Sequence, residues 1–237
     1  MLITTKGIVL HSTKYSDTSL IVKLFTEKRG VQSFIVKGAF SKKSRFRASI
    51  FSPMALVSAT YDDHHNDRLK YFKDISRLDT GMELSFDPAR SAILLFYNEL
   101  LYKLLFESGE DEVLFHFLEE EIAKVFEEDI ELTDLPLRFL LRLSIILGFF
   151  PENNYSESNC YFSLSESKFQ SYLIDEKEEI PKEESLYLSL LLRNNSPVAA
   201  PRHTRNNLLH YLIKYYKTHN EQIRDIESAE ILASVLH

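Results

Sequence analysis

The apolar and polar residues follow two different patterns along the chain. Up to about residue 80, short apolar runs alternate with turn residues, at 7–10, 19–26, 31–36, 54–61 and 69–75. Runs of this length between Gly, Pro and Asp are typical of β-strands. Five short strands favour a small closed barrel, because closure removes exposed strand edges. We therefore predict a five-stranded OB-fold β-barrel over residues 1–80.

From residue 87 onward the apolar residues recur about every 3.6 positions, which is the period of an amphipathic helix. The pattern predicts helices at 89–107, 112–127, 136–148, 184–194, 204–218 and 227–236. The helix at 136–148 is apolar on nearly every side and is expected at the centre of a bundle. The predicted fold class is α+β, with a strand domain at 1–80 and a mainly helical domain at 81–237.

The same period assigns a buried face to the first two helices. The apolar stripe of the helix at 89–107 consists of Ile93, Phe96, Tyr97, Leu100, Leu104 and Leu105. In the helix at 112–127, the residues expected to point inward are Val113, Phe117, Ile122 and Phe126. Its acidic run is expected to face solvent.

The segment between residues 151 and 184 is polar, but two short stretches in it alternate apolar and polar residues. These stretches, 161–164 and 169–173, predict a short hairpin inserted near residues 155–175. The one cysteine, Cys160, is expected to be a packed thiol, since a single cysteine forms neither an intramolecular disulfide nor a multi-cysteine zinc site.

Histidines are the remaining candidates for metal binding. His64 and His65 are adjacent, with Asp62, Asp63 and Asp67 around them. Such a cluster could hold a cation, but no second ligand group at helical or strand spacing accompanies it. A solvated turn is therefore favoured, and we predict no metal and no cofactor.

The net charge of −7 conceals a strong asymmetry. Residues 1–80 contain 14 Lys and Arg against 7 Asp and Glu, whereas residues 81–237 contain 14 against 28. The most basic segment is KGAFSKKSRFR, whose cations are Lys37, Lys42, Lys43, Arg45 and Arg47. Positive groups gathered in one loop are typical of phosphate binding. A solvated basic loop is the competing interpretation, and charge alone does not decide between the two.

Aromatic residues within and near this segment favour nucleic acid as the phosphate ligand. Phe40 and Phe46 lie in the polar loop, where stacking on an unpaired base is worth about 1–3 kcal/mol. Phe34 is expected in the barrel core instead, since it lies inside the third strand. Lys14 and Tyr15 follow the first strand and are predicted to border the same face. No recognition-helix pattern accompanies the charges, so sequence-specific readout is not expected.

The chain carries no recognisable catalytic motif. It has no Walker-type loop, no GxSxG and no HExxH. The acids at 119–121 point in different directions on a helix, so a solvated face is favoured over paired catalytic carboxylates. We therefore expect a binding protein and not an enzyme. Because no window holds about 18 uninterrupted apolar residues and the N-terminal apolar run is too short for a signal peptide, we expect a cytoplasmic protein with no membrane partner.

Two further basic groups lie in the helical half. Four cations occur between residues 198 and 220 without one acid: Arg202, Arg205, Lys214 and Lys217. They either extend the phosphate-binding surface or meet an acidic partner; a surface helix docked on the acidic helices is slightly favoured. Arg138 and Arg142 are four residues apart on the most apolar helix, where a buried Arg needs a carboxylate partner or access to solvent.

The order of several motifs resembles the RecO family of bacterial recombination mediators. GIVL, YSDTSLIVKLFTEKRG, VKGAFSKKSRFR and SPMALVSATY are similar to its N-terminal OB domain, and LPLRFLLRLSIILGFFP, LLHYLIKYY and IRDIESAEIL to its helical half. The likeness runs in order along nearly the whole chain. Many members carry a four-cysteine zinc module after the LGF-P segment. Here that stretch reads ENNYSESNCYFSLSESKF, so the zinc module is expected to be absent.

The resemblance implies a DNA repair protein of the cytoplasm, associated with the nucleoid. Family members bind single- and double-stranded DNA, anneal complementary strands, and work with RecR and single-stranded-DNA-binding protein (SSB) to load the RecA recombinase. The resemblance also implies a groove for the acidic SSB tail, with Arg138 and Arg142 as its basic residues. Internal pairing of these arginines with the acids at 119–121 is the competing interpretation. The alternative function is a protein-interaction adaptor, which a weak salt dependence of DNA affinity would favour.

Overall fold

The computed structural model describes residues 1–40, 46, 48–63, 69–78, 87–105, 108–173, 175, 178–194 and 196–236. The chain forms two compact units, residues 1–128 and 129–237. The first unit holds the large sheet and two helices, because one of these helices packs against the first strand and the other against that helix. The predicted division at residues 80 and 81, which separates strands from helices, stays a prediction.

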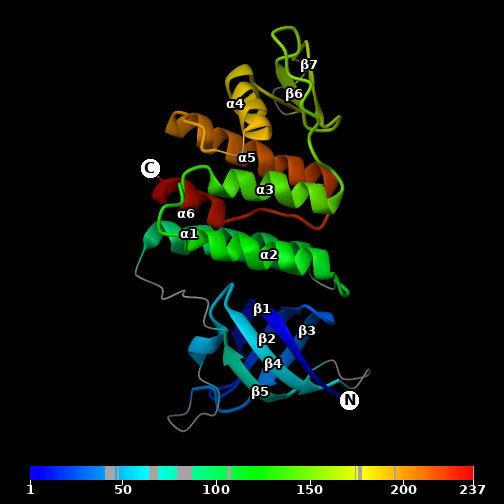
Figure 1. The fold of residues 1–237 in the computed structure, drawn as a ribbon, viewed down its shortest axis with the longest axis vertical. Helices are drawn as coiled ribbons and strands as arrows, with labels where there is room; N and C mark the ends of the chain where they lie inside the picture. The colour runs from blue at the N-terminus through cyan, green and yellow to red at the C-terminus, as the bar shows by residue number, and fades with distance from the viewer. Residues whose placement is uncertain are drawn as a thin grey trace. The chain divides into compact units, whose positions relative to one another are not determined.

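Five antiparallel strands build the first unit (Figure 1). They are β1 (Leu2–Lys14), β2 (Leu20–Thr26), β3 (Gly30–Val36), β4 (Leu56–Asp62) and β5 (Phe72–Arg77), in the sheet order β3-β2-β1-β4-β5. A short 3-10 helix, Ala48–Phe51, precedes β4. All five predicted strands are confirmed. β1 begins earlier than predicted because residues 2–6 pair with β4, although their mixed polarity hides this in the sequence.

Among the described residues, one bridge joins the two edges of this sheet. Phe34 of β3 forms a parallel bridge with Lys70, just before β5. The Ile35 N–H donates to the Lys70 carbonyl, and the Lys70 N–H donates to the Ser33 carbonyl, both at 2.9 Å. No ladder along the described part of β5 continues this contact, so the sheet curls without the predicted closure. The predicted α+β class, with an OB-like five-stranded sheet followed by helices, is confirmed.

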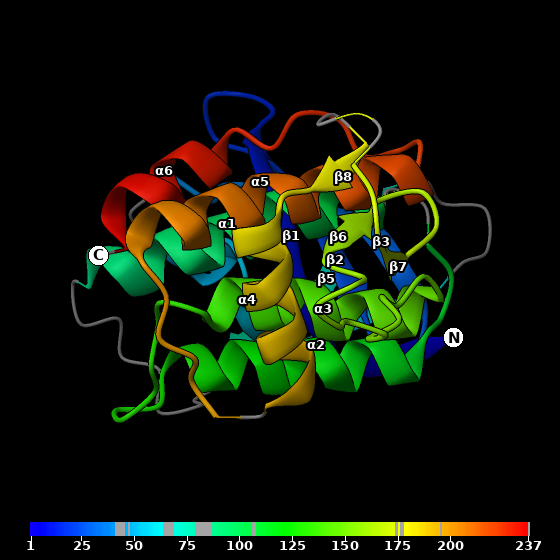
Figure 2. The same ribbon diagram turned by 90° about the horizontal axis from the view of Figure 1, so that it is seen from above.

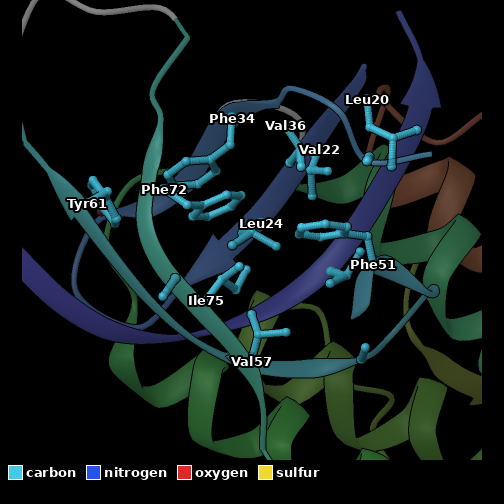
Figure 3. Close-up of a cluster of buried hydrophobic side chains, with 14 residues drawn as sticks. Leu20, Val22, Leu24, Phe34, Val36, Phe51, Val57, Tyr61, Phe72 and Ile75 are labelled. Carbon is cyan, nitrogen blue, oxygen red and sulfur yellow. The ribbon is translucent and has the colours of Figure 1, made fainter. Parts of the chain in front are cut away.

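Alternate residues of the strands fill the core of the sheet (Figure 3). Val22 and Leu24 of β2 and Phe34 of β3 have no exposed surface. Phe34 stacks on Phe72 of β5 with ring centroids 4.1 Å apart. An aromatic pair in this geometry stabilises the fold beyond the area that it buries. Phe34 therefore belongs to the core, as expected from its place inside the third strand.

Two helices complete the first unit, α1 (Pro88–Leu104) and α2 (Glu112–Val125). Asp87 caps α1 by accepting a hydrogen bond from the Ala89 N–H at 2.8 Å. The predicted apolar stripe of α1 is buried. For α2 the predicted face is partly wrong: Val113 is 71% exposed, and the buried apolar residues are Leu114, Phe115, Leu118, Ile122 and Val125. Two adjacent apolar stripes fit the sequence of α2 equally well, and packing selects the one through Leu114.

Four helices form most of the second unit: α3 (Leu135–Leu147), α4 (Lys182–Arg193), α5 (Arg202–His219) and α6 (Ser228–Val235). α3 ends at Gly148, whose φ of 84° suits a residue without a side chain. α5 contacts α3, α4 and α6, and α4 runs across it (Figure 2). α5 thus occupies the central place that the pattern predicted for α3.

A small sheet follows α3 in the chain. It contains β6 (Tyr161–Ser163), β7 (Lys168–Gln170) and β8 (Glu179–Ile180), in the order β7-β6-β8. The predicted hairpin is confirmed as β6 and β7, whereas β8 is too short to show a period in the sequence. Cys160 is buried beside β6, as expected for a packed thiol. Within the described ranges, the helices are all too short or too polar to cross a membrane.

Candidate nucleic-acid interface and helical groove

Strand register brings residues from separate loops to the same end of the large sheet. Lys14 of β1 pairs with Leu20 of β2, and Leu20 also pairs with Val36 of β3. Tyr15 and Lys37 are the next residues along β1 and β3, so both leave the sheet at this end. Both are exposed, Tyr15 by 63%.

Tyr71, which immediately precedes β5, joins the same end of the sheet through Lys37. The Lys37 Nζ lies 5.1 Å from the centroid of the Tyr71 ring, a distance typical of a cation–π contact. The ring remains 55% exposed. The sequence analysis did not single out Tyr71, although the inward Phe72 implies an outward neighbour. We term the following set the rim: Lys14, Tyr15, Lys37, Phe40 and Tyr71.

The two phenylalanines predicted to stack on bases lie in different surroundings. Phe40 is 50% exposed. Phe46 is partly buried against the core of the sheet, where its ring centroid lies 6.4 Å from that of Phe72. Phe40 is therefore open to a ligand, while Phe46 packs mainly inward. Four predicted cations lie outside the described residues: Lys42, Lys43, Arg45 and Arg47.

Two other cations of the first unit are held by Asp63, whose side chain is only 7% exposed. Asp63 accepts hydrogen bonds from the Lys70 Nζ at 2.6 Å and the Arg29 Nε at 2.9 Å. These bonds, with Lys70 first, lower the pKa of the Asp63 carboxyl to about 2. The carboxylate stays charged at neutral pH and keeps both cations engaged. At the rim, Lys14 instead meets the fully exposed Asp17 at 3.3 Å, a weak contact in water.

Arg138 of α3 is engaged inside the second unit. Its Nε donates to Asp134 Oδ2 at 2.9 Å, its Nη1 to the Asn194 carbonyl at 2.6 Å, and its Nη2 to the Ser196 carbonyl. Arg138 therefore pairs internally, although not with the acids at 119–121. Of those acids, Glu119 pairs with Lys6 and Glu121 with Lys124. The spacing of Asp134 and Arg138, four residues apart at a helix start, is the signal in the sequence that shows this pair.

Asp134 is itself buried and joins several segments. Its Oδ2 also accepts a hydrogen bond from the Val198 N–H at 3.2 Å. Burial first, and then the Asp134 carboxylate, raise the pKa of the Tyr187 hydroxyl on α4 above its ordinary value. Asp134 thus lies where the start of α3, the body of α4 and the segment between α4 and α5 meet.

A groove of about 210 Å³ lies between α3 and α4. Its walls consist of Arg138, Leu141, Arg142, Ile145, Phe150, Leu191 and Leu192. Ile145 and Phe150 remain 55% and 44% exposed. An apolar surface with two arginines fits a ligand that is apolar and also carries a carboxylate. The sequence indicated the arginines, but the apolar walls come from α3 and α4 together and show only in the fold.

Two predicted cations at the start of α5 act within the fold. Arg202 donates to the carbonyls of Ala233 at 2.9 Å and Ser234 at 3.0 Å, in the last turn of α6. Such carbonyls have no partner within their own helix and favour a cation. Arg205 donates to the Ala200 carbonyl at 2.6 Å. Both side chains therefore hold backbone of the second unit.

The other two predicted cations, Lys214 and Lys217, line a wider groove of about 560 Å³ between α5 and α6. Lys217 pairs with the exposed Asp225 at 2.7 Å. Glu227 and Glu230 line the same groove. Its mixed charge does not favour a polyanion over other ligands.

Side chains suited to metal binding do not gather in the described ranges, where no three His, Cys, Asp or Glu residues form a potential site. His64, His65 and Asp67 lie outside the described residues. Asp62 pairs with Lys73 at 3.1 Å, and Asp63 with Lys70 and Arg29.

Family models match both parts of the chain. Recombination protein O N terminal matches residues 1–80, and Recombination protein O C terminal matches residues 85–225. A DNA repair protein RecO of Phocaeicola vulgatus is 31% identical over 236 residues, and one of Bacteroides fragilis is 32% identical over 237 residues, each covering 98% of both chains. A RecO of Flavobacterium psychrophilum is 29% identical over 241 residues, with 99% of both chains covered. The chain therefore belongs to the RecO family of DNA repair proteins.

Proposed function

We propose that the protein is a non-enzymatic mediator of DNA repair and homologous recombination. It binds single- and double-stranded DNA, anneals complementary strands, and helps RecR to load RecA onto single strands covered by SSB. Family membership supports the role in repair. The observation that carries DNA binding is the rim, where exposed aromatic and basic side chains from three loops meet at one end of a sheet.

The chemistry of the rim suits single strands best. Tyr15, Phe40 and Tyr71 offer exposed rings, and each ring that stacks on a base contributes about 1–3 kcal/mol. Bases of a duplex already stack on one another, so duplex DNA gains from the lysines alone. Lys14 and Lys37 neutralise phosphates and release counterions, whatever the sequence.

Stacking on the flat face of a base also favours annealing. A base held in this way keeps its Watson–Crick edge open to a complementary strand. Contacts to phosphates carry no sequence information, so any pair of complementary strands is accepted. A site that read base edges would instead compete with the second strand.

The groove between α3 and α4 is proposed to receive the C-terminal tail of SSB. By resemblance to the family, this tail is acidic and ends in a phenylalanine carboxylate. Ile145 and Phe150 supply apolar surface for the ring, and the basic wall of the groove attracts the acids. RecR is proposed as a partner from the family resemblance alone.

The test is binding of fluorescent single-stranded DNA across a salt series. Wild type is compared with a Lys42/Lys43/Arg45/Arg47→Ala variant. The control is a Lys168/Lys182/Arg193/Arg224→Ala variant, which changes the net charge equally in the second unit. We expect affinity and salt slope to fall in the first variant alone, the slope by about 0.7 for each phosphate that is no longer neutralised. Weak binding with a shallow salt slope in all three proteins would favour the adaptor function.

A further inference from the structure

Arg138 and Arg142 both line the groove between α3 and α4, and the bonds of Arg138 limit what this residue can offer a ligand. The side chain of Arg138 is only 13% exposed, and each of its three guanidinium nitrogens donates to an acceptor of the second unit. A carboxylate that took the Arg138 fork would have to displace two backbone carbonyls. Those carbonyls would then lie near the surface without their donor.

The three acceptors of Arg138 all belong to the backbone after α4 or bind to it. Asn194 follows the last turn of α4, and Ser196 lies two residues further along. Asp134, the partner of the Arg138 Nε, also accepts from the Val198 N–H. Thus one buried ion pair fixes this stretch of backbone from two sides.

This stretch of backbone continues directly from a wall of the groove. Leu191 and Leu192, which line the groove, belong to the last turn of α4 and end two residues before Asn194. Moving Asn194 therefore moves these leucines relative to α3. At its far end the segment is held again, because Arg205 donates to the Ala200 carbonyl.

We propose that Arg138 is a positioning residue: with Asp134 it fixes the segment after α4, and so the width of the groove, while Arg142 supplies the positive charge that the ligand meets. This inference rests on the proposed binding of an acidic, apolar tail in that groove. Arg142 lies one turn further along α3, on the side of the exposed Ile145 and Phe150. A ligand on these apolar residues meets the part of the groove wall that Arg142 lines.

The effect of removing Asp134 on ligand affinity distinguishes a positioning role of Arg138 from direct contact with the ligand. If Arg138 bound the ligand, removing the competing Asp134 carboxylate would release it and strengthen binding of an anion. If Arg138 positions the segment, removing Asp134 loosens the leucine wall and weakens binding. Arg138→Ala and Asp134→Ala should therefore act alike, each weakening binding by about 2- to 30-fold.

The probe is a fluorescent acidic peptide that ends in a free phenylalanine carboxylate, titrated into the full chain across a salt series. We expect Arg138→Ala and Asp134→Ala both to lose affinity, although they change the charge of the groove wall in opposite directions. Arg142→Ala should lose affinity and also lower the slope, because it removes a charge from the binding surface. Tighter binding by Asp134→Ala, or a slope that falls in Arg138→Ala and not in Arg142→Ala, overturns the assignment.

Hydrogen exchange of the free protein gives a second readout. The Val198 amide, which donates to Asp134, should exchange faster in Arg138→Ala and Asp134→Ala, and at the wild-type rate in Arg142→Ala. If Asp134→Ala does not fold, Asp134→Asn keeps the shape and removes the charge, and faster exchange of the Val198 amide is still expected. Unchanged exchange in every variant overturns the positioning role. Failure of the wild-type protein to bind the peptide, with the exchange result as expected, rejects the tail ligand alone.

Discussion

Lys37 of the large sheet and Arg138 of the second unit carry the same charge in opposite surroundings. Lys37 is exposed and lies over the ring of Tyr71, itself 55% exposed. Arg138 is only 13% exposed and donates to Asp134 and to two backbone carbonyls. A cation of the first kind can exchange water for a ligand, whereas one of the second kind is already part of the fold.

A basic residue in a sequence can therefore be either available to a ligand or engaged within the fold. A count of positive charges does not distinguish Lys37 from Arg138. The difference is that Arg138 has a buried acidic partner, Asp134, which holds its charge within the fold. Asp134 and Asp63 each engage cations within their own unit. The rim has no comparable buried acid among the described residues: Asp17, which meets Lys14, is fully exposed.

The largest effect is expected from breaking the buried pair. Asp134→Ala leaves Arg138 partly buried without its carboxylate, which typically costs about 3–5 kcal/mol of the free energy of unfolding. The control is Asp225→Ala, since Asp225 also pairs at 2.7 Å but its side chain is 94% exposed; a loss of at most about 1 kcal/mol is expected. Urea unfolding followed by circular dichroism measures both. Equal losses in the two variants would erase the contrast between buried and exposed pairs.

An intermediate effect is expected from removing the ring that the sequence analysis missed. Tyr71→Ala should weaken binding of single-stranded DNA by about 1–3 kcal/mol and leave stability nearly unchanged, because the ring is exposed. Tyr172→Ala in the second unit is the matched control, since Tyr172 is 57% exposed. Fluorescence anisotropy with a labelled oligonucleotide compares the two. If both tyrosines matter equally, stacking is not confined to the rim.

Acid pH should test the engaged cations of the first unit. The pKa of Asp63 is lowered from 3.8 to about 2, so its ion pairs stabilise the fold fully above pH 4 and lose this contribution as the pH falls toward 2. The stability difference between wild type and Asp63→Asn should therefore shrink by about 1–2 kcal/mol over this range. Unfolding curves at pH 6, 4 and 2.5 follow it. A difference that is constant with pH contradicts the assignment.

The smallest effect is expected from a single rim lysine. Lys37→Gln should lower the salt slope of single-strand binding by about 0.7, the value for one neutralised phosphate, with a small loss of affinity. Lys168→Gln, in an exposed pair with Glu166 at 3.4 Å, should leave the slope unchanged. The same anisotropy titration in several salt concentrations measures this. An unchanged slope in Lys37→Gln would show that this residue does not bind phosphate.

The sequence predicts much of the fold because strands and helices leave different periods. Some apolar patterns are long enough to predict both the type of element and its buried face. Examples are the runs around Val22 and Phe34 and the helical stripe through Ile93 and Leu100. The face of α2 is ambiguous because Val113 and Leu114 begin two equally good stripes. The open sheet and β8 depend on pairing between segments far apart in the sequence. The local period of apolar residues does not reveal such pairing.

The sites are less predictable for a related reason. Phe40 and Tyr15 could be placed from their position beside basic residues in loops, but Tyr71 lies 34 residues from its partner Lys37 and joins it only through the curl of the sheet. The arginines of α3 look alike in sequence. Only the fold shows that Arg138 donates to the segment after α4. Its acceptors there are backbone carbonyls, which every residue type has, so the sequence does not reveal them.

The most direct test of two separate sites is single-stranded DNA affinity measured for two variants, Lys37→Ala/Tyr71→Ala and Arg142→Ala. We expect the rim variant to lose at least about tenfold in affinity, which corresponds to about 1.4 kcal/mol and lies within the range for one stacked base. The Arg142 variant should bind as wild type does. Wild-type affinity in the rim variant, or an equal loss in the Arg142 variant, would contradict the assignment of DNA binding to the rim.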